Sequence, residues 1–137
     1  MPTNVPSVDV PNYFAQRRQS SNPSPLKLLQ QAAEQMTTRT NGLVVGEVFV
    51  APFAGTTRYT FYLEIPTLND YSDSLFYVWT DQANFGYPVH VIADGNQEDN
   101  RVYKTATAFA SRLSEMFKEQ WVKDRIAQYI ELAENTA

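Results

Sequence analysis

The stretch that decides the fold is residues 43–65, LVVGEVFVAPFAGTTRYTFYLEI. It is rich in β-branched and aromatic residues, which favour extended structure. Ala54 and Gly55 interrupt it with a short, turn-forming connection. The stretch therefore predicts two strands, 43–53 and 57–65, paired as a hairpin.

Two further strands are expected downstream of this hairpin. Residues 75–80 and 87–93 favour β structure, and the segment 81–86 between them has the Asn, Asp and Gly residues of a turn. Residues 66–73 are expected to form an exposed loop. The middle of the chain therefore predicts an antiparallel sheet of about four strands.

A helix is expected before the sheet, beginning at Pro25. Ser24 can cap its free amide groups, and proline loses no needed hydrogen bond at the first helical position. Leu26, Leu29, Ala33 and Met36 follow at helical spacing. The pair Asn41-Gly42 favours the positive φ angles of a helix exit, so the helix should end shortly before it.

The C-terminal third is expected to be helical, opening after Asp99 or Asn100 as the cap. Its first apolar stripe includes Val102, and a second stripe that starts at Val122 is out of phase with it. A single straight helix over 101–134 would be about 50 Å long, too long for a domain of this size. We therefore expect a break between Phe117 and Trp121.

These elements define the expected organisation of the chain. Residues 1–24 hold four of the eight prolines together with Ser and Asn, and are expected to form a flexible arm. Residues 25–137 are expected to form a single α+β domain, in which an antiparallel sheet of about four strands packs against C-terminal helices and a short N-terminal helix.

Composition and charge exclude several classes of function. The 137 residues include no cysteine, which removes thiolate nucleophiles and thiolate metal sites. The net charge is −4, and residues 41–100 hold one basic side chain against eight acidic ones. This acidity argues against nucleic acid as a partner. No apolar run is long enough to span a bilayer, and Met1–Val10 lacks the features of a secretory signal, so we expect no membrane partner and a cytoplasmic location.

Few residues carry recognisable chemistry. His90 is the only histidine, and it would need Ser72 or Ser74 and Asp94 to complete a catalytic triad without any nucleophile-elbow motif. The acidic run 94–100 departs from a calcium-binding loop at its sixth and twelfth positions. We therefore expect no catalytic residue, no cofactor and no metal site, and the sequence favours a function without catalysis.

The aromatic content of the sheet points instead to binding. Phe, Tyr or Trp occupy 11 of the 39 residues from Phe49 to Tyr87. Both faces of the sheet are therefore expected to be apolar, and one of them to need cover from a partner. The interface is assigned to Val48, Val50, Tyr62, Phe76 and Val78.

The expected function is that of a non-catalytic protein-interaction module, of the inhibitor, chaperone or adaptor type. A homodimer or another protein partner would cover the second face of the sheet. The alternative is a small-molecule-binding protein or an enzyme, with a pocket between sheet and helices at Tyr77, Trp79 and His90.

Overall fold

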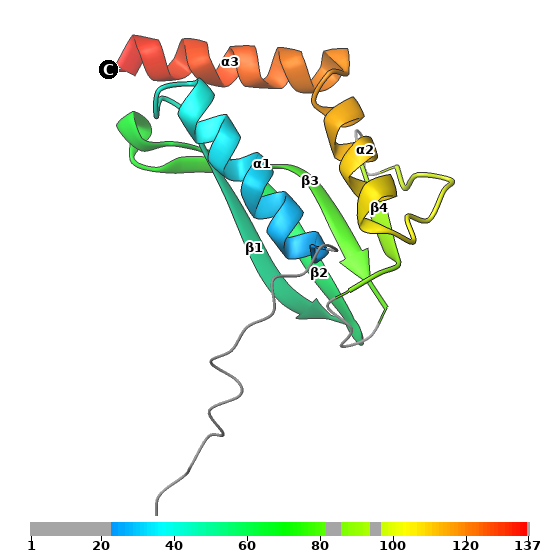
Figure 1. The fold of residues 1–137 in the computed structure, drawn as a ribbon. Coiled ribbons are helices and arrows are strands. Elements are labelled where there is room, and N and C mark those ends of the chain that lie inside the picture. Colours follow the sequence, from blue (N-terminus) through cyan, green and yellow to red (C-terminus); the bar gives the residue numbers. More distant parts are fainter. Residues whose placement is uncertain (1–22, 82–85, 94–96, 137) are drawn as a thin grey trace, which may run out of the picture.

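An antiparallel four-stranded sheet and three α-helices make up the part of the chain that the structure, a computed structural model, describes: residues 23–81, 86–93 and 97–136 (Figure 1). The elements follow in the order α1 (Pro25–Arg39), β1 (Val45–Phe53), β2 (Thr56–Ile65), the 3-10 turn η2 (Pro66–Leu68), β3 (Tyr71–Thr80), β4 (Val89–Ile92), α2 (Ala106–Met116) and α3 (Gln120–Thr136). The α+β class predicted from the sequence is confirmed. The predicted arm falls almost entirely on residues 1–22, outside the described residues.

Helix α1 begins and ends where the sequence predicts. The Ser24 side chain accepts a hydrogen bond from the amide of Lys27, and Pro25 is the first helical residue. At the other end, Asn41 and Gly42 have φ angles of 55° and 79°. These left-handed conformations turn the chain out of the helix and direct it into β1.

The hairpin of β1 and β2 turns at Ala54 and Gly55, whose φ angles are 51° and 80°. Two central residues with positive φ form the turn type whose twist matches that of paired strands. Because Phe53 then pairs with Thr56, Val50 lies opposite Tyr59 and Val48 opposite Phe61. Even-numbered residues of β1 therefore share a face with odd-numbered residues of β2.

This register corrects the predicted sheet faces. From the sequence, both faces of the sheet are expected to be apolar, and Val48 and Val50 are grouped with Tyr62. In the structure Tyr62 lies opposite Glu47 instead, on the other face from Val48. A shift of one residue in strand pairing exchanges the two faces, so an error in the relative register of two strands mixes buried residues with exposed ones.

Strand β3 is longer than predicted and contains a bulge. It starts at Tyr71, within the predicted loop, and its register with β2 shifts between Phe61 and Tyr62. The extra residue is Leu75, which is buried together with its neighbour Phe76. The bulge turns the start of β3 so that two consecutive side chains reach the core.

The prediction that the C-terminal helix opens at Asp99 or Asn100 is wrong. The cap of α2 is Thr105, whose side chain accepts a hydrogen bond from the amide of Ala108. The preceding segment instead lies along β4, where Tyr103 pairs with Val89 and Glu98 with Ile92. Val102, predicted on the apolar stripe, is consequently exposed.

The predicted break in the C-terminal helices is confirmed. Helix α2 ends at Met116 and α3 begins at Gln120. Figure 1 shows α3 running across the end of the sheet, whereas α2 lies over β4 and α1 over β1 and β2.

The three helices pack on one face of the sheet, and the core lies between the two layers. Phe61 stacks on Phe76 with 5.1 Å between ring centroids, and Phe117, at the end of α2, meets the edge of both rings. Helix α1 approaches β1 so closely that Ala33 lies directly against Gly46. The opposite face of the sheet carries none of the described helices.

Candidate functional site: the open face of the sheet

The face of the sheet opposite the helices, called here the open face, is the first candidate for a functional site. Strand pairing places on it, in rows across the sheet, the side chains of Glu47, Phe49, Ala51, Phe53, Arg58, Thr60, Tyr62, Glu64, Ser72, Ser74, Tyr77, Trp79, His90 and Ile92. Phe49 is 60% exposed and Phe53 is 54% exposed. Burying such side chains against a partner would remove apolar surface from water and so stabilise the complex.

Arg58 lies at the centre of this aromatic surface. Its guanidinium carbon is 4.0 Å from the ring centroid of Phe53 and 4.3 Å from that of Tyr77. Both contacts are cation–π interactions, and together they hold the guanidinium in place between two rings. Within the described residues Arg58 makes no ion pair.

Trp79 and His90 form a second cluster on the open face. Their rings are stacked, with 3.7 Å between centroids and an interplanar angle of 4°. Trp79 Nε1 donates a hydrogen bond of 3.1 Å to Glu98 Oε1, and His90 Nδ1 lies 3.8 Å from Glu98 Oε2. Glu98, in the segment that lies along β4, therefore places a carboxylate at this edge of the open face.

The end of the open face near η2 is acidic. Glu64 is next to Glu47 across the strand pair and also interacts with Asp70. Burial, together with the neighbouring carboxylates Glu47 and Asp70, raises the pKa of Glu64. A cation supplied from outside the described residues would relieve this repulsion.

The structure places the sequence-assigned interface residues on both faces. Phe76 and Val78 are 2% and 0% exposed beneath the helices, so they belong to the core. Val48 is partly buried on that same face, and Val50 is 37% exposed at its margin. Only Tyr62 lies on the open face, while the exposed Phe49 and Phe53 were not assigned to the interface.

The structure brings the residues of the alternative pocket together, but not at the place predicted from the sequence. Tyr77, Trp79 and His90 are neighbours in β3 and β4, but they lie on the open face and not between sheet and helices. The register also separates His90 from the serines of the suggested triad. Ser74 is five positions from Trp79, the partner of His90, which corresponds to about 15 Å along the strand. Asp94, the third member, lies outside the described residues.

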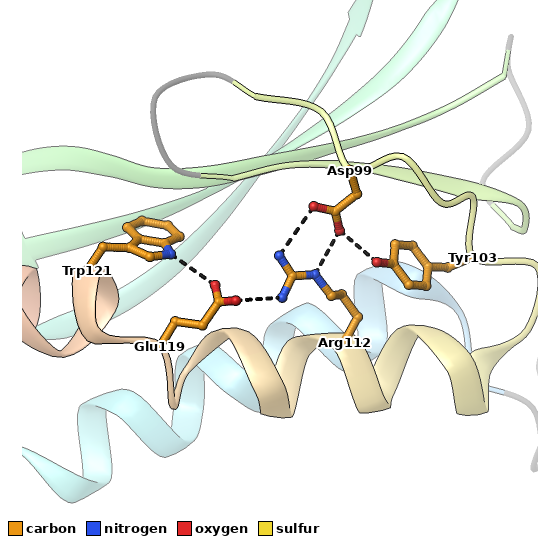
Figure 2. A network of polar contacts seen from close by, with 5 residues as sticks. All are labelled: Asp99, Tyr103, Arg112, Glu119 and Trp121. Carbon is orange, nitrogen blue, oxygen red and sulfur yellow. Dashed lines mark hydrogen bonds and ion pairs between the residues drawn. The ribbon is translucent and has the colours of Figure 1, made fainter.

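A network of polar contacts joins the segment along β4 to the helices (Figure 2). Arg112 of α2 makes two hydrogen bonds to the carboxylate of Asp99, of 2.7 and 3.2 Å, and a third of 3.2 Å to Glu119. Tyr103 donates to Asp99, and Trp121 Nε1 donates to Glu119. The hydrogen bond to Asp99 is the main cause that raises the pKa of Arg112.

Each of the five polar side chains in this network has a hydrogen-bond partner within it, which indicates a structural role. Burial and the hydrogen bond to Asp99 raise the pKa of Tyr103 to about 12, so both its proton and the charge of Arg112 are fixed at neutral pH. Through Arg112, the network joins Asp99, in the segment before α2, to Glu119 at the junction of α2 and α3. It thereby also positions Glu98 beside Trp79 on the open face.

A cleft of about 550 Å³ lies on the helix side of the molecule, between α1 and the C-terminal helices. Leu28, Ala32, Met36 and Phe117 contribute to its apolar lining, and Arg39 and Lys118 are among its polar lining residues. The lining contains no carboxylate and no histidine, so it offers no acid–base pair.

The described residues contain no group of three or more His, Asp or Glu side chains that is suited to hold a metal ion. None of the helices in the described segments combines the length and the apolar character of a membrane-spanning segment. Comparison with protein-family models, with curated proteins and with solved structures gives no match for this chain.

Proposed function

We propose that this protein is a non-catalytic protein-interaction module and that the open face is its binding surface. The observation that carries the proposal is the set of exposed aromatic side chains on a sheet face that no described helix covers. Exposed contiguous apolar surface marks interaction sites in soluble proteins, and aromatic residues and Arg are enriched in protein interfaces.

The arrangement of the face supports binding more than catalysis. Arg58 is held between two aromatic rings with its remaining hydrogen-bond donors available, a geometry that suits a carboxylate from a partner. His90 is occupied by stacking on Trp79 and is far from Ser74. The open face therefore provides anchors for a partner and no nucleophile–base pair.

Substitution of one exposed aromatic residue tests the proposal. Phe49→Ser removes a 60% exposed ring from the open face, and Leu132→Ser, on α3, is the matched control because Leu132 is also exposed. Tagged wild-type chain and both variants would be cross-linked in cells, and every captured protein would be verified by direct binding to the purified chain.

We expect the verified binding to weaken at least tenfold with Phe49→Ser and to be unchanged with Leu132→Ser. Truncation of a large aromatic anchor in an interface produces an effect of this size. If Phe49→Ser binds every verified partner as well as the wild type, the open face is not the binding surface and the proposal fails.

A further inference from the structure

The open face is patterned so that its two ends complement one another. Along β3, the large side chains Trp79 and Tyr77 occupy one end and the small Ser74 and Ser72 occupy the other. Along β2, Arg58 lies in the row of Trp79 and Glu64 lies in the row of Ser72. A surface with large rings and Arg58 at one end, and small side chains and Glu64 at the other, is complementary to a copy of itself turned end to end.

The charges at the two ends are unpaired within the described residues. The Arg58 guanidinium lies over two aromatic rings and makes no ion pair with the described residues, and Glu64 faces the carboxylates of Glu47 and Asp70. Glu64 is six positions from Arg58 along β2, which is about 20 Å in an extended strand. They are therefore too far apart to pair within one chain, and each needs an opposite charge from outside.

We propose, on the basis of the function proposed above, that the occupant of the open face is a second copy of this chain. The two sheets pack open face against open face about 10 Å apart, related by a two-fold axis that lies between them and crosses the strands at the level of Phe61. This operation turns each strand end to end over its own copy. Arg58 then lies over Glu64 of the partner subunit, and the reverse contact forms by symmetry.

The same operation matches the side chains by size. Trp79 faces Ser72 of the partner subunit, Tyr77 faces Ser74 of the partner subunit, and Tyr62 faces Thr60 of the partner subunit. On β2 and β3 each large ring therefore meets a small hydroxyl residue, so these strands interdigitate with those of the copy, whereas Phe49 of β1 meets Glu47 of the partner subunit. A two-fold axis parallel to the strands and centred on the sheet would instead place β2 over β3 of the partner subunit. Arg58 would then lie over Trp79 of the partner subunit, and Glu64 would meet no opposite charge.

The area of the face is sufficient for such a dimer. Strands of about 27 Å spaced about 4.8 Å apart give a face of roughly 500 Å² per copy, or about 1,000 Å² in total. This is near the lower limit for a specific interface. We therefore expect a dimer that dissociates at micromolar concentration and depends on the Arg58–Glu64 contacts.

Charge exchange between two variants tests this arrangement. The variants Arg58→Glu and Glu64→Arg each place like charges at both symmetry-related contacts. When they are mixed, every contact in the heterodimer again joins a glutamate to an arginine. Sedimentation velocity over 1–100 µM would measure the mass, with circular dichroism as the check on folding.

At the highest concentrations of this range we expect a mass near two 15.6 kDa chains for the wild type, at least tenfold weaker association for each variant alone, and restored association in the mixture. Lys123→Glu and Glu134→Arg, exposed on α3, are charge-reversal controls expected to associate like the wild type. Ser74→Trp is a further test because Ser74 is exposed: it should disrupt the dimer by steric conflict and leave the monomer folded.

Three results would overturn the inference: a wild type that stays monomeric at 100 µM, a mixture that does not recover association, or a Ser74→Trp variant that associates normally. A monomeric wild type whose verified binding to a different protein is lost with Phe49→Ser would refute the self-association and leave the proposed function standing. If binding also persists with Phe49→Ser, both proposals fail.

Discussion

Replacing Gly46 by alanine tests the packing of α1 on the sheet. A Cβ atom at this position would lie 2.8 Å from both Cα and the carbonyl oxygen of Ala33. These are main-chain atoms of a helix, so they cannot move aside as a side chain would. The helix must move away from β1, or β1 must bend.

The magnitude follows from two losses. Overpacking of a well-filled interior costs about 1–3 kcal/mol. The shift also strains the hydrogen bond of 3.0 Å from the Gly46 amide to Thr37 Oγ1, which contributes about 1 kcal/mol. We therefore expect Gly46→Ala to lower the free energy of unfolding by about 2–4 kcal/mol, and the melting temperature by roughly 6–14 °C for a chain of this size.

Urea unfolding and thermal melting would measure the effect, with Gly55→Ala as the matched control. Gly55 has a φ of +80° and no atom within 4 Å of its added Cβ, so this variant incurs only backbone strain of about 1 kcal/mol. Ala33→Gly should not rescue Gly46→Ala, because the conflicting atoms belong to the main chain. If Gly46→Ala is as stable as the wild type, or if Ala33→Gly restores its stability, the close contact is wrong.

Three further predictions concern other parts of the chain. Arg112→Met should lower the free energy of unfolding by about 2–4 kcal/mol in urea, because it removes the ion pair of the largely buried Asp99 and leaves that carboxylate only the hydrogen bond from Tyr103; a loss below 1 kcal/mol would contradict this. Burial is the main cause that raises the pKa of Tyr87 and the pKa of Tyr103, both to about 12. The folded state therefore favours the neutral form of both side chains, and the stabilisation that this gives is present below pH 10 and lost between pH 10 and 12. Urea midpoints should therefore fall between pH 9 and pH 11, and equal midpoints would refute the assignment. Deletion of residues 1–22 should lower the melting temperature by less than about 8 °C, and a larger fall would show that the arm stabilises the domain.

Local sequence signals predicted the elements well wherever a nearby residue decides the outcome. Ser24 and Pro25 fix the start of α1, and the positive φ of Asn41 and Gly42 fixes its exit. The break after Met116 followed from the change of phase between two apolar stripes. In each case the controlling interaction lies within a few residues of the boundary, so the sequence alone contains it.

The start of α2 was predicted wrongly because a distant contact outweighs the local signal. Asp99 is a good capping residue by type, but its carboxylate binds Arg112, and the neighbouring backbone pairs with β4. Thr105, which actually caps the helix, gave the same kind of local signal. Only the approach of α2 to β4 decides which of the two residues becomes the cap.

The candidate site shows the same division between local and distant information. The aromatic content of 43–80 and the Ala54-Gly55 turn are local features, and they specified an aromatic antiparallel sheet. The turn also implies the pairing of Phe53 with Thr56, and a strict use of that register would have placed Phe49 with Tyr62 on one face. The bulge at Leu75, in contrast, has no strong signal in the sequence.

The sequence by itself determined the class of the fold, the order of the elements and the ends of α1, because these depend on propensity, periodicity and capping within short segments. The tertiary structure alone decided which face of the sheet remains open. All three helices pack on the face of Phe61, so Phe49, Arg58, Tyr77 and Trp79 are left on the other. The physical reason is that strand alternation makes two faces available, whereas the choice of the face to cover depends on contacts between segments far apart in the chain.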